Sequence, residues 1–170
     1  MHSLRDLNAC DAANFVAVCG PVYEHAPWVA ERVVAQRPFA SRESLHAAMQ
    51  AAVAAAPASQ QLDLIRGHPD LVGRAAAAGE LTAESTAEQA AAGLFDLSAA
   101  QREAFGRYNA AYRERFGFPF VICARENRTE AILAAFPVRL EHSLDEERAT
   151  ALREIGRIAW LRLLDRVSEP

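Results

Sequence analysis

The chain has 170 residues, of which 51% are hydrophobic and 24% charged, and its formal net charge is −4. This length and composition predict one globular domain over residues 1–170 and argue against a disordered chain. A slightly acidic protein lacks the basic surface that releases counterions from phosphates, so no nucleic acid is expected as a partner. No window approaches the roughly 18 apolar residues that span a bilayer, so no membrane contact is expected either.

In chain order, apolar residues recur at helical spacing and sustained strand-like alternation is missing. A first helix is predicted over residues 11–19. A second starts near Pro27, Ser41 opens a third, and a fourth begins around Ser59.

The later helix starts are predicted from capping boxes, in which Ser or Asn is followed three residues on by Glu or Gln. These boxes begin at Ser85, Ser98, Asn127 and Ser143. The stretch FGFPFVICA (116–124) is apolar but contains a proline, which would interrupt a central strand, so it is predicted to be a buried extended connector. The expected fold class is therefore all-α, a single-domain bundle of about seven to nine helices.

Two residues in the stretch from Gly67 to Leu94 each allow a structural and a chemical interpretation. His68 precedes Pro69, which suits a loop leading to a helix whose first turn holds the proline, but its pKa range also suits proton transfer. Glu88 is the third residue after Ser85, so its carboxylate either completes a capping box or lies beside an anion site at a helix N-terminus.

The last helix carries an arginine on its apolar side. Arg162 lies in angle between Ile155 and Ile158, and an arginine directed inward needs an anionic partner. That partner is either a carboxylate of the protein in a structural ion pair or a substrate carboxylate.

The residue inventory limits the chemistry. All 18 basic residues are arginine, so a Schiff-base lysine and a phosphate-binding Walker lysine are both excluded. The five histidines show no metal-ligand spacing, so no metal site is expected. Three cysteines, an odd number, favour reduced thiols and a cytoplasmic location.

Four motifs together resemble a known family: GHPDL, ELTAESTAEQAAAGL, FGFPFVICA and LRLLDRV, in this order and spacing. The chain is similar, over nearly its whole length, to 2-oxo-4-hydroxy-4-carboxy-5-ureidoimidazoline (OHCU) decarboxylases, the last enzymes on the route from urate to (S)-allantoin. The resemblance implies an all-α homodimeric enzyme without a cofactor, acting on a ureide carboxylate. It also implies urate oxidase and hydroxyisourate hydrolase as neighbours in the pathway.

The resemblance assigns His68 as the proton donor that sets the S configuration and Glu88 as the second catalytic residue. It assigns substrate contacts to Pro69, Ser85, Gln89, Phe120, Val121, Ile122, Cys123, Ala124 and Arg162. For the terminal arginine, Arg157 and Arg166 are the neighbouring alternatives. Two other functions stay open: the same machinery with a different ureide or hydantoin carboxylate, and a non-catalytic helical dimer in which His68 and Glu88 are only caps.

Overall fold

The computed structural model describes residues 1–169, which form two compact units. The first unit combines Met1–Gly67 with the chain from Gly156 onward, and the second is His68–Ile155. Helix α10 (Leu144–Arg166) contributes to both. The predicted all-α class is confirmed, with ten α-helices and one two-stranded sheet among the described residues.

In the first unit the predicted helices are confirmed to within about two residues, and one further helix precedes them. The elements are α1 (Leu4–Ala9), α2 (Ala12–Cys19), η1 (Gly20–Val22), α3 (Trp28–Val33), η2 (Val34–Gln36), α4 (Arg42–Ala54) and α5 (Ala58–Arg66). Helix α1 has only six residues, too few to show a helical period, and the Ser3 hydroxyl caps it.

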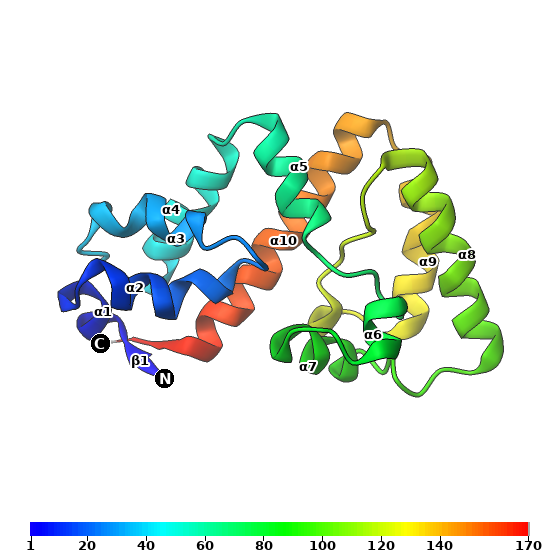
Figure 1. Cartoon of the computed structure of the whole chain (residues 1–170), viewed down its shortest axis with the longest axis horizontal. Helices are drawn as coiled ribbons and strands as arrows, with labels where there is room; N and C mark the ends of the chain where they lie inside the picture. The colour runs from blue at the N-terminus through cyan, green and yellow to red at the C-terminus, as the bar shows by residue number, and fades with distance from the viewer. Residues whose placement is uncertain (170) are drawn as a thin grey trace. The chain divides into compact units, whose positions relative to one another are not determined.

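The two ends of the chain meet in the first unit. Strand β1 (His2–Ser3) pairs in parallel with β2 (Val167–Ser168), and Figure 1 shows the blue and red ends side by side. Helix α4 contacts α10 at Gly156. A Cβ at this position would lie only 2.6 Å from the Gln50 side-chain nitrogen, Nε2. His46 of α4 completes this contact, with Nε2 2.8 Å from the Gly156 carbonyl oxygen.

The second unit is built around α8 and α9, which lie alongside each other in Figure 1. Its elements are α6 (Arg74–Ala78), α7 (Ala83–Ala91), α8 (Ala99–Phe116), η3 (Ala124–Glu126), α9 (Thr129–Leu140) and the first half of α10. The α8–α9 interface is aromatic: the Tyr108 and Phe136 rings stack 5.1 Å apart, and Phe105 meets Phe136 edge-on. The stretch between α8 and η3 is extended and largely buried, as predicted.

Two of the four predicted capping boxes are confirmed. Ser98 and Gln101 exchange side-chain-to-backbone hydrogen bonds of 2.9 and 3.2 Å at the start of α8. Ser143 and Glu146 do the same at the start of α10, at 2.8 and 3.3 Å. In both places the serine stands directly before the first helical residue.

The other two predicted boxes are wrong. The N-cap of α7 is Thr82, whose hydroxyl accepts a 3.2 Å bond from the Ser85 N–H, so Ser85 already lies in the first turn. Near α9, the Asn127 side chain donates instead to the Cys123 carbonyl, and the N-cap position is taken by Arg128 without a side-chain cap bond. At α7 an earlier hydroxyl takes the capping position, and near α9 the asparagine side chain bonds a nearby carbonyl instead.

All three cysteines are free thiols. Among residues 1–169, no helix combines the length and apolar character needed to cross a membrane.

Candidate active site

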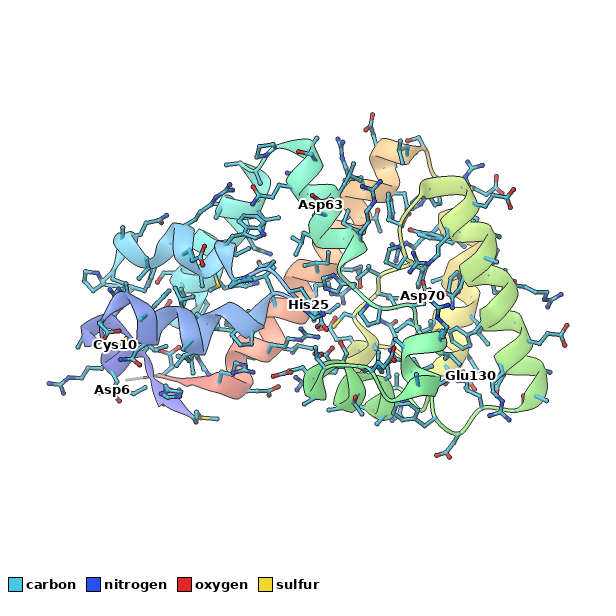
Figure 2. The ribbon with its side chains drawn as sticks, viewed as in Figure 1. Asp6, Cys10, His25, Asp63, Asp70 and Glu130 are labelled. Carbon is cyan, nitrogen blue, oxygen red and sulfur yellow. The ribbon has the colours of Figure 1, made fainter. Side chains whose placement is uncertain are left out.

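His68 opens the second unit on a loop that runs to Gly73, and its side chain is buried, with 6% exposure. Pro69 also lies in this loop, half-buried, and not in the first turn of a helix as predicted, since α6 begins only at Arg74. A tight turn separates Pro69 from α6 and delays the start of the helix. In this turn the Gly73 N–H donates to the carbonyl of Asp70, a residue labelled in Figure 2, at 3.3 Å.

This turn carries backbone strain. Val72, its third residue, has a φ of 55°, in the left-handed region that β-branched residues rarely adopt. A positive φ at that position is the geometry of a type II turn, where glycine or asparagine is usual. The fourth position does require glycine, because a Cβ at Gly73 would lie 2.6 Å from the Asp70 Cβ.

Helix α7 presents a polar inner face. Glu88, Gln89 and Ala92 come three, four and seven residues after Ser85, which places all four on one side of the helix. Ser85 and Gln89 are buried and Glu88 is half-buried. Glu88 is the sixth residue of α7, so it neither caps the helix nor belongs to its N-terminal anion site, contrary to the prediction from the sequence.

Hydrogen bonds join the His68 loop to α7 and α8. The Gln89 side-chain oxygen accepts a 3.1 Å bond from the Val72 N–H. The Asn109 side chain, on α8, donates a buried 2.9 Å bond to the Leu71 carbonyl. The loop that begins at His68 is therefore held against the face of α7 that carries Glu88.

The segment Phe120–Ala124 lies in the same unit. It leads directly into η3, which packs against α7. The Cys123 N–H donates to Glu154 Oε2 at 2.8 Å, and its carbonyl accepts from Asn127 Nδ2 at 2.9 Å. Ile122 is half-buried, and its backbone N–H and C=O make no hydrogen bond within residues 1–169. These two groups are consequently suited to bind a polar ligand.

A buried charged network supports the start of this segment. Arg139 Nη1 donates to the Val121 carbonyl at 2.7 Å, and its guanidinium carbon lies 4.3 Å from the centre of the Phe120 ring. The Arg139 Nε bonds at 2.9 Å to Glu147, which is 0% exposed and also accepts from the Tyr112 hydroxyl. Burial, followed by this bond to Glu147, raises the pKa of Tyr112 above its ordinary range, so the hydroxyl stays a donor.

A comparison with protein families identifies the chain. A family model described as OHCU decarboxylase matches residues 8–164, which is most of the sequence. The chain belongs to the OHCU decarboxylase family. The resemblance drawn from the motifs is thereby confirmed.

Relatives with OHCU decarboxylase or (S)-allantoin synthase names match nearly the whole chain. The protein named 2-oxo-4-hydroxy-4-carboxy-5-ureidoimidazoline decarboxylase from Haloferax volcanii is 48% identical over 170 residues, covering 99% of each chain. A crystal structure of (S)-allantoin synthase matches 99% of this chain and 54% of its own, with a TM-score of 0.81 and 30% identity. A crystal structure of OHCU decarboxylase in the presence of (S)-allantoin has a TM-score of 0.68 at 22% identity, which supports the fold.

Among the residues assigned from the OHCU decarboxylase family, Arg162 is the one in the first unit. Its side chain is 3% exposed, which confirms that it points inward. Nη1 lies 2.5 Å from Oε2 of Glu24, itself buried, so the structural ion pair foreseen as one alternative is present. A contact with substrate stays a prediction.

The sequence analysis missed Asn109, Glu147 and Glu154. Asn109 follows Phe105 and precedes Tyr112 at helical spacing, so it is a polar residue on an apolar stripe, the same signal that singled out Arg162. Glu147 gives the same signal, because it precedes Ala151 and Ile155 by four and eight residues, whereas Glu154 is half-buried beside the apolar stripe and gives none. No group of three or more His, Cys, Asp or Glu side chains in the described part of the chain is placed to hold a metal ion.

Proposed function

We propose that this chain decarboxylates OHCU to (S)-allantoin in urate catabolism, and that it does so without a cofactor. Membership of the OHCU decarboxylase family over residues 8–164 supports the reaction. The observation that carries the site is the bond from the Val72 N–H to Gln89, which ties the His68 loop to the helix of Glu88.

The reaction needs no covalent bond between the protein and the substrate. The bond from the ring carbon to the carboxylate breaks, CO₂ leaves, and the electron pair passes into the conjugated C=N and carbonyl of the substrate's own ring. The ring nitrogen of the former C=N and the ureido-bearing carbon next to it then each take a proton, while the hydroxyl on the decarboxylated carbon gives one up to become the second ring carbonyl. One proton is taken up in total, and the protonation at carbon sets the configuration. Because the substrate supplies the electron sink that a lysine or cofactor often provides, the protein has to orient the substrate, exclude water and deliver that proton.

His68 donates the proton in this proposal, and Glu88 orients or charge-couples the imidazole. In this proposal the proton reaches one face of the ring from the imidazole and gives the S configuration, and the burial of His68 supports it by limiting the access of water. The substrate contacts in this proposal are Pro69, Ser85, Gln89, Phe120, Val121, Ile122, Cys123, Ala124 and Arg162. Ile122 offers one backbone donor and one backbone acceptor to the ureide, and Arg162 takes the carboxylate.

The proposal includes a homodimer in the cytoplasm that works downstream of urate oxidase and hydroxyisourate hydrolase. The name of one relative supports the place in urate degradation: the protein from Bacillus subtilis is named a uric acid degradation bifunctional protein.

Circular dichroism of the product tests the function. Urate is oxidised freshly in the presence of hydroxyisourate hydrolase, and the chain is added. We expect a rapid rise of the (S)-allantoin signal, compared with slow racemic product without the chain. His68→Ala should abolish the acceleration and Glu88→Gln should nearly abolish it, while both variants stay folded.

His2→Ala serves as the matched control, because this histidine is exposed on β1. It should keep full activity. A folded wild-type chain that gives no (S)-allantoin excess would contradict the proposal and direct the search to another ureide carboxylate. Full activity of His68→Ala would remove His68 from the mechanism.

A further inference from the structure

One peptide group in the His68 loop is held at both ends by side-chain amides. Its carbonyl, from Leu71, accepts from Asn109 Nδ2 at 2.9 Å, and its N–H, from Val72, donates to Gln89 Oε1 at 3.1 Å. We call Asn109 and Gln89 the amide clamp. The two residues come from different helices, α8 and α7, so the clamp joins the loop to both.

The clamp acts on the strained residue of the loop. A valine with a φ of 55° is strained, and such a conformation persists only where the surroundings enforce it. The clamp fixes the peptide directly before Val72, and rotation of that peptide is what would release the strain. The Asp70–Arg113 pair, with Nε 2.9 and 3.0 Å from the two carboxylate oxygens, is a second tether, but it is half-exposed and correspondingly weak.

Stability alone does not account for an asparagine at this position of α8. Asn109 is 8% exposed, and its Oδ1 is buried without a hydrogen-bond partner among the described residues. The desolvation of an unpaired buried acceptor is unfavourable and offsets most of the stability that the bond from Asn109 to Leu71 contributes.

We propose that Asn109 is a positioning residue for the decarboxylation. Together with Gln89 it keeps the Leu71–Val72 peptide in its strained orientation and thereby sets where His68 lies relative to Glu88. This inference rests on the proposed function, because it gives His68 and Glu88 their catalytic roles.

The test is Asn109→Leu, which keeps the shape and removes the donor. A displacement of about 1 Å at a catalytic group can cost up to 10²-fold in rate, so we expect kcat to fall about tenfold or more with KM little changed. Adding Val72→Gly should restore most of the lost kcat, because glycine takes a positive φ without strain and no longer needs the clamp. All rates are measured well below the midpoint of thermal unfolding.

Asn8→Leu is the matched control. Asn8 holds a backbone in the same way in the first unit, donating to the Phe39 carbonyl at 2.9 Å and accepting from the Phe39 N–H at 2.8 Å. Its removal should lower the unfolding temperature and leave kcat unchanged.

If Asn109→Leu fails to fold, Asn109→Asp replaces it, since an ionised carboxylate has no donor for the Leu71 carbonyl. The same loss and the same rescue by Val72→Gly are expected. An unchanged kcat, or a loss that Val72→Gly does not rescue, overturns the positioning role. An inactive wild-type chain would overturn the proposed function instead, so the two failures are distinguishable.

Discussion

Arg162 and Glu24 form a buried ion pair in the first unit, with Nη1 2.5 Å from Oε2 and neither side chain more than 3% exposed. Both charges are removed from water, which makes a close partner of opposite charge valuable to each. A change at one of them therefore takes a close counter-charge away from the other.

We predict that Glu24→Ala lowers the free energy of unfolding by about 3–5 kcal/mol, the usual cost of breaking a buried pair from one side. The double variant Glu24→Leu/Arg162→Leu should lose clearly less than the sum of the two single variants, because it removes both buried charges together. Urea unfolding followed by circular dichroism measures all three. Simple additivity would show that the two side chains are not coupled.

We also predict an effect of Arg162 on substrate binding. If its remaining N–H groups hold the substrate carboxylate, Arg162→Leu in the Glu24→Leu background should raise KM severalfold with a smaller effect on kcat. Steady-state rates with freshly generated substrate test this. An unchanged KM would move the carboxylate contact to Arg157 or Arg166.

Two residues of the α7 region, Thr82 and Glu88, are expected to affect different properties, the first stability and the second activity. Thr82→Ala should lower the free energy of unfolding by about 1 kcal/mol, because it removes the acceptor for the Ser85 N–H. Glu88→Gln should lower activity without a comparable loss of stability, since Glu88 lies past the first turn. Thermal unfolding and initial rates are compared for the two variants. The reverse pattern would show that Glu88 is the structural residue.

The network under Phe120 and Val121 should dominate the stability of the second unit. Glu147→Ala should cost about 3–5 kcal/mol, because it strands the buried Arg139 charge. Tyr112→Phe should cost less, about 1–3 kcal/mol, because the Arg139–Glu147 pair survives. Chemical denaturation measures the free energy of unfolding of both variants. Equal losses would mean that the tyrosine hydroxyl contributes as much to stability as the ion pair.

His46 predicts a pH dependence of stability. Burial lowers the pKa of its imidazole below the ordinary value of about 6.5, against a smaller opposing effect of the Gly156 carbonyl. The unfolded chain therefore binds the proton more readily, so His46 reduces stability as the pH falls through 6.5, down to the folded-state pKa. His46→Gln should flatten the dependence of the unfolding free energy on pH between 5 and 7. His2→Ala should leave that slope unchanged.

Periodicity and caps were enough to predict most helices, because the apolar stripe of α4 and the boxes at Ser98 and Ser143 depend on residues near in sequence. They also showed that Arg162 points inward. The start of α7 was misplaced because Thr82 and Ser85 both begin a cap-like pattern, and only the helix itself shows which hydroxyl accepts.

The hydrogen bonds that support the candidate site could not be predicted from the sequence, for a different reason. Asn109 bonds a carbonyl 38 residues earlier in the chain, and Arg139 bonds one 18 residues earlier. Such pairs depend on the tertiary fold and leave no local pattern. Within α8, Asn109 could be marked as unusual, but its partner could not be named.

The discontinuity of the first unit has a consequence for synthesis. Ribosomes release the chain from its N-terminus, so the second unit, continuous from His68 to Ile155, emerges complete before the first. Until Val167 and Arg162 emerge, the pairing of β1 with β2 and the ion pair between Glu24 and Arg162 cannot form. We therefore expect the nascent N-terminal segment to stay incompletely folded, although it is made first.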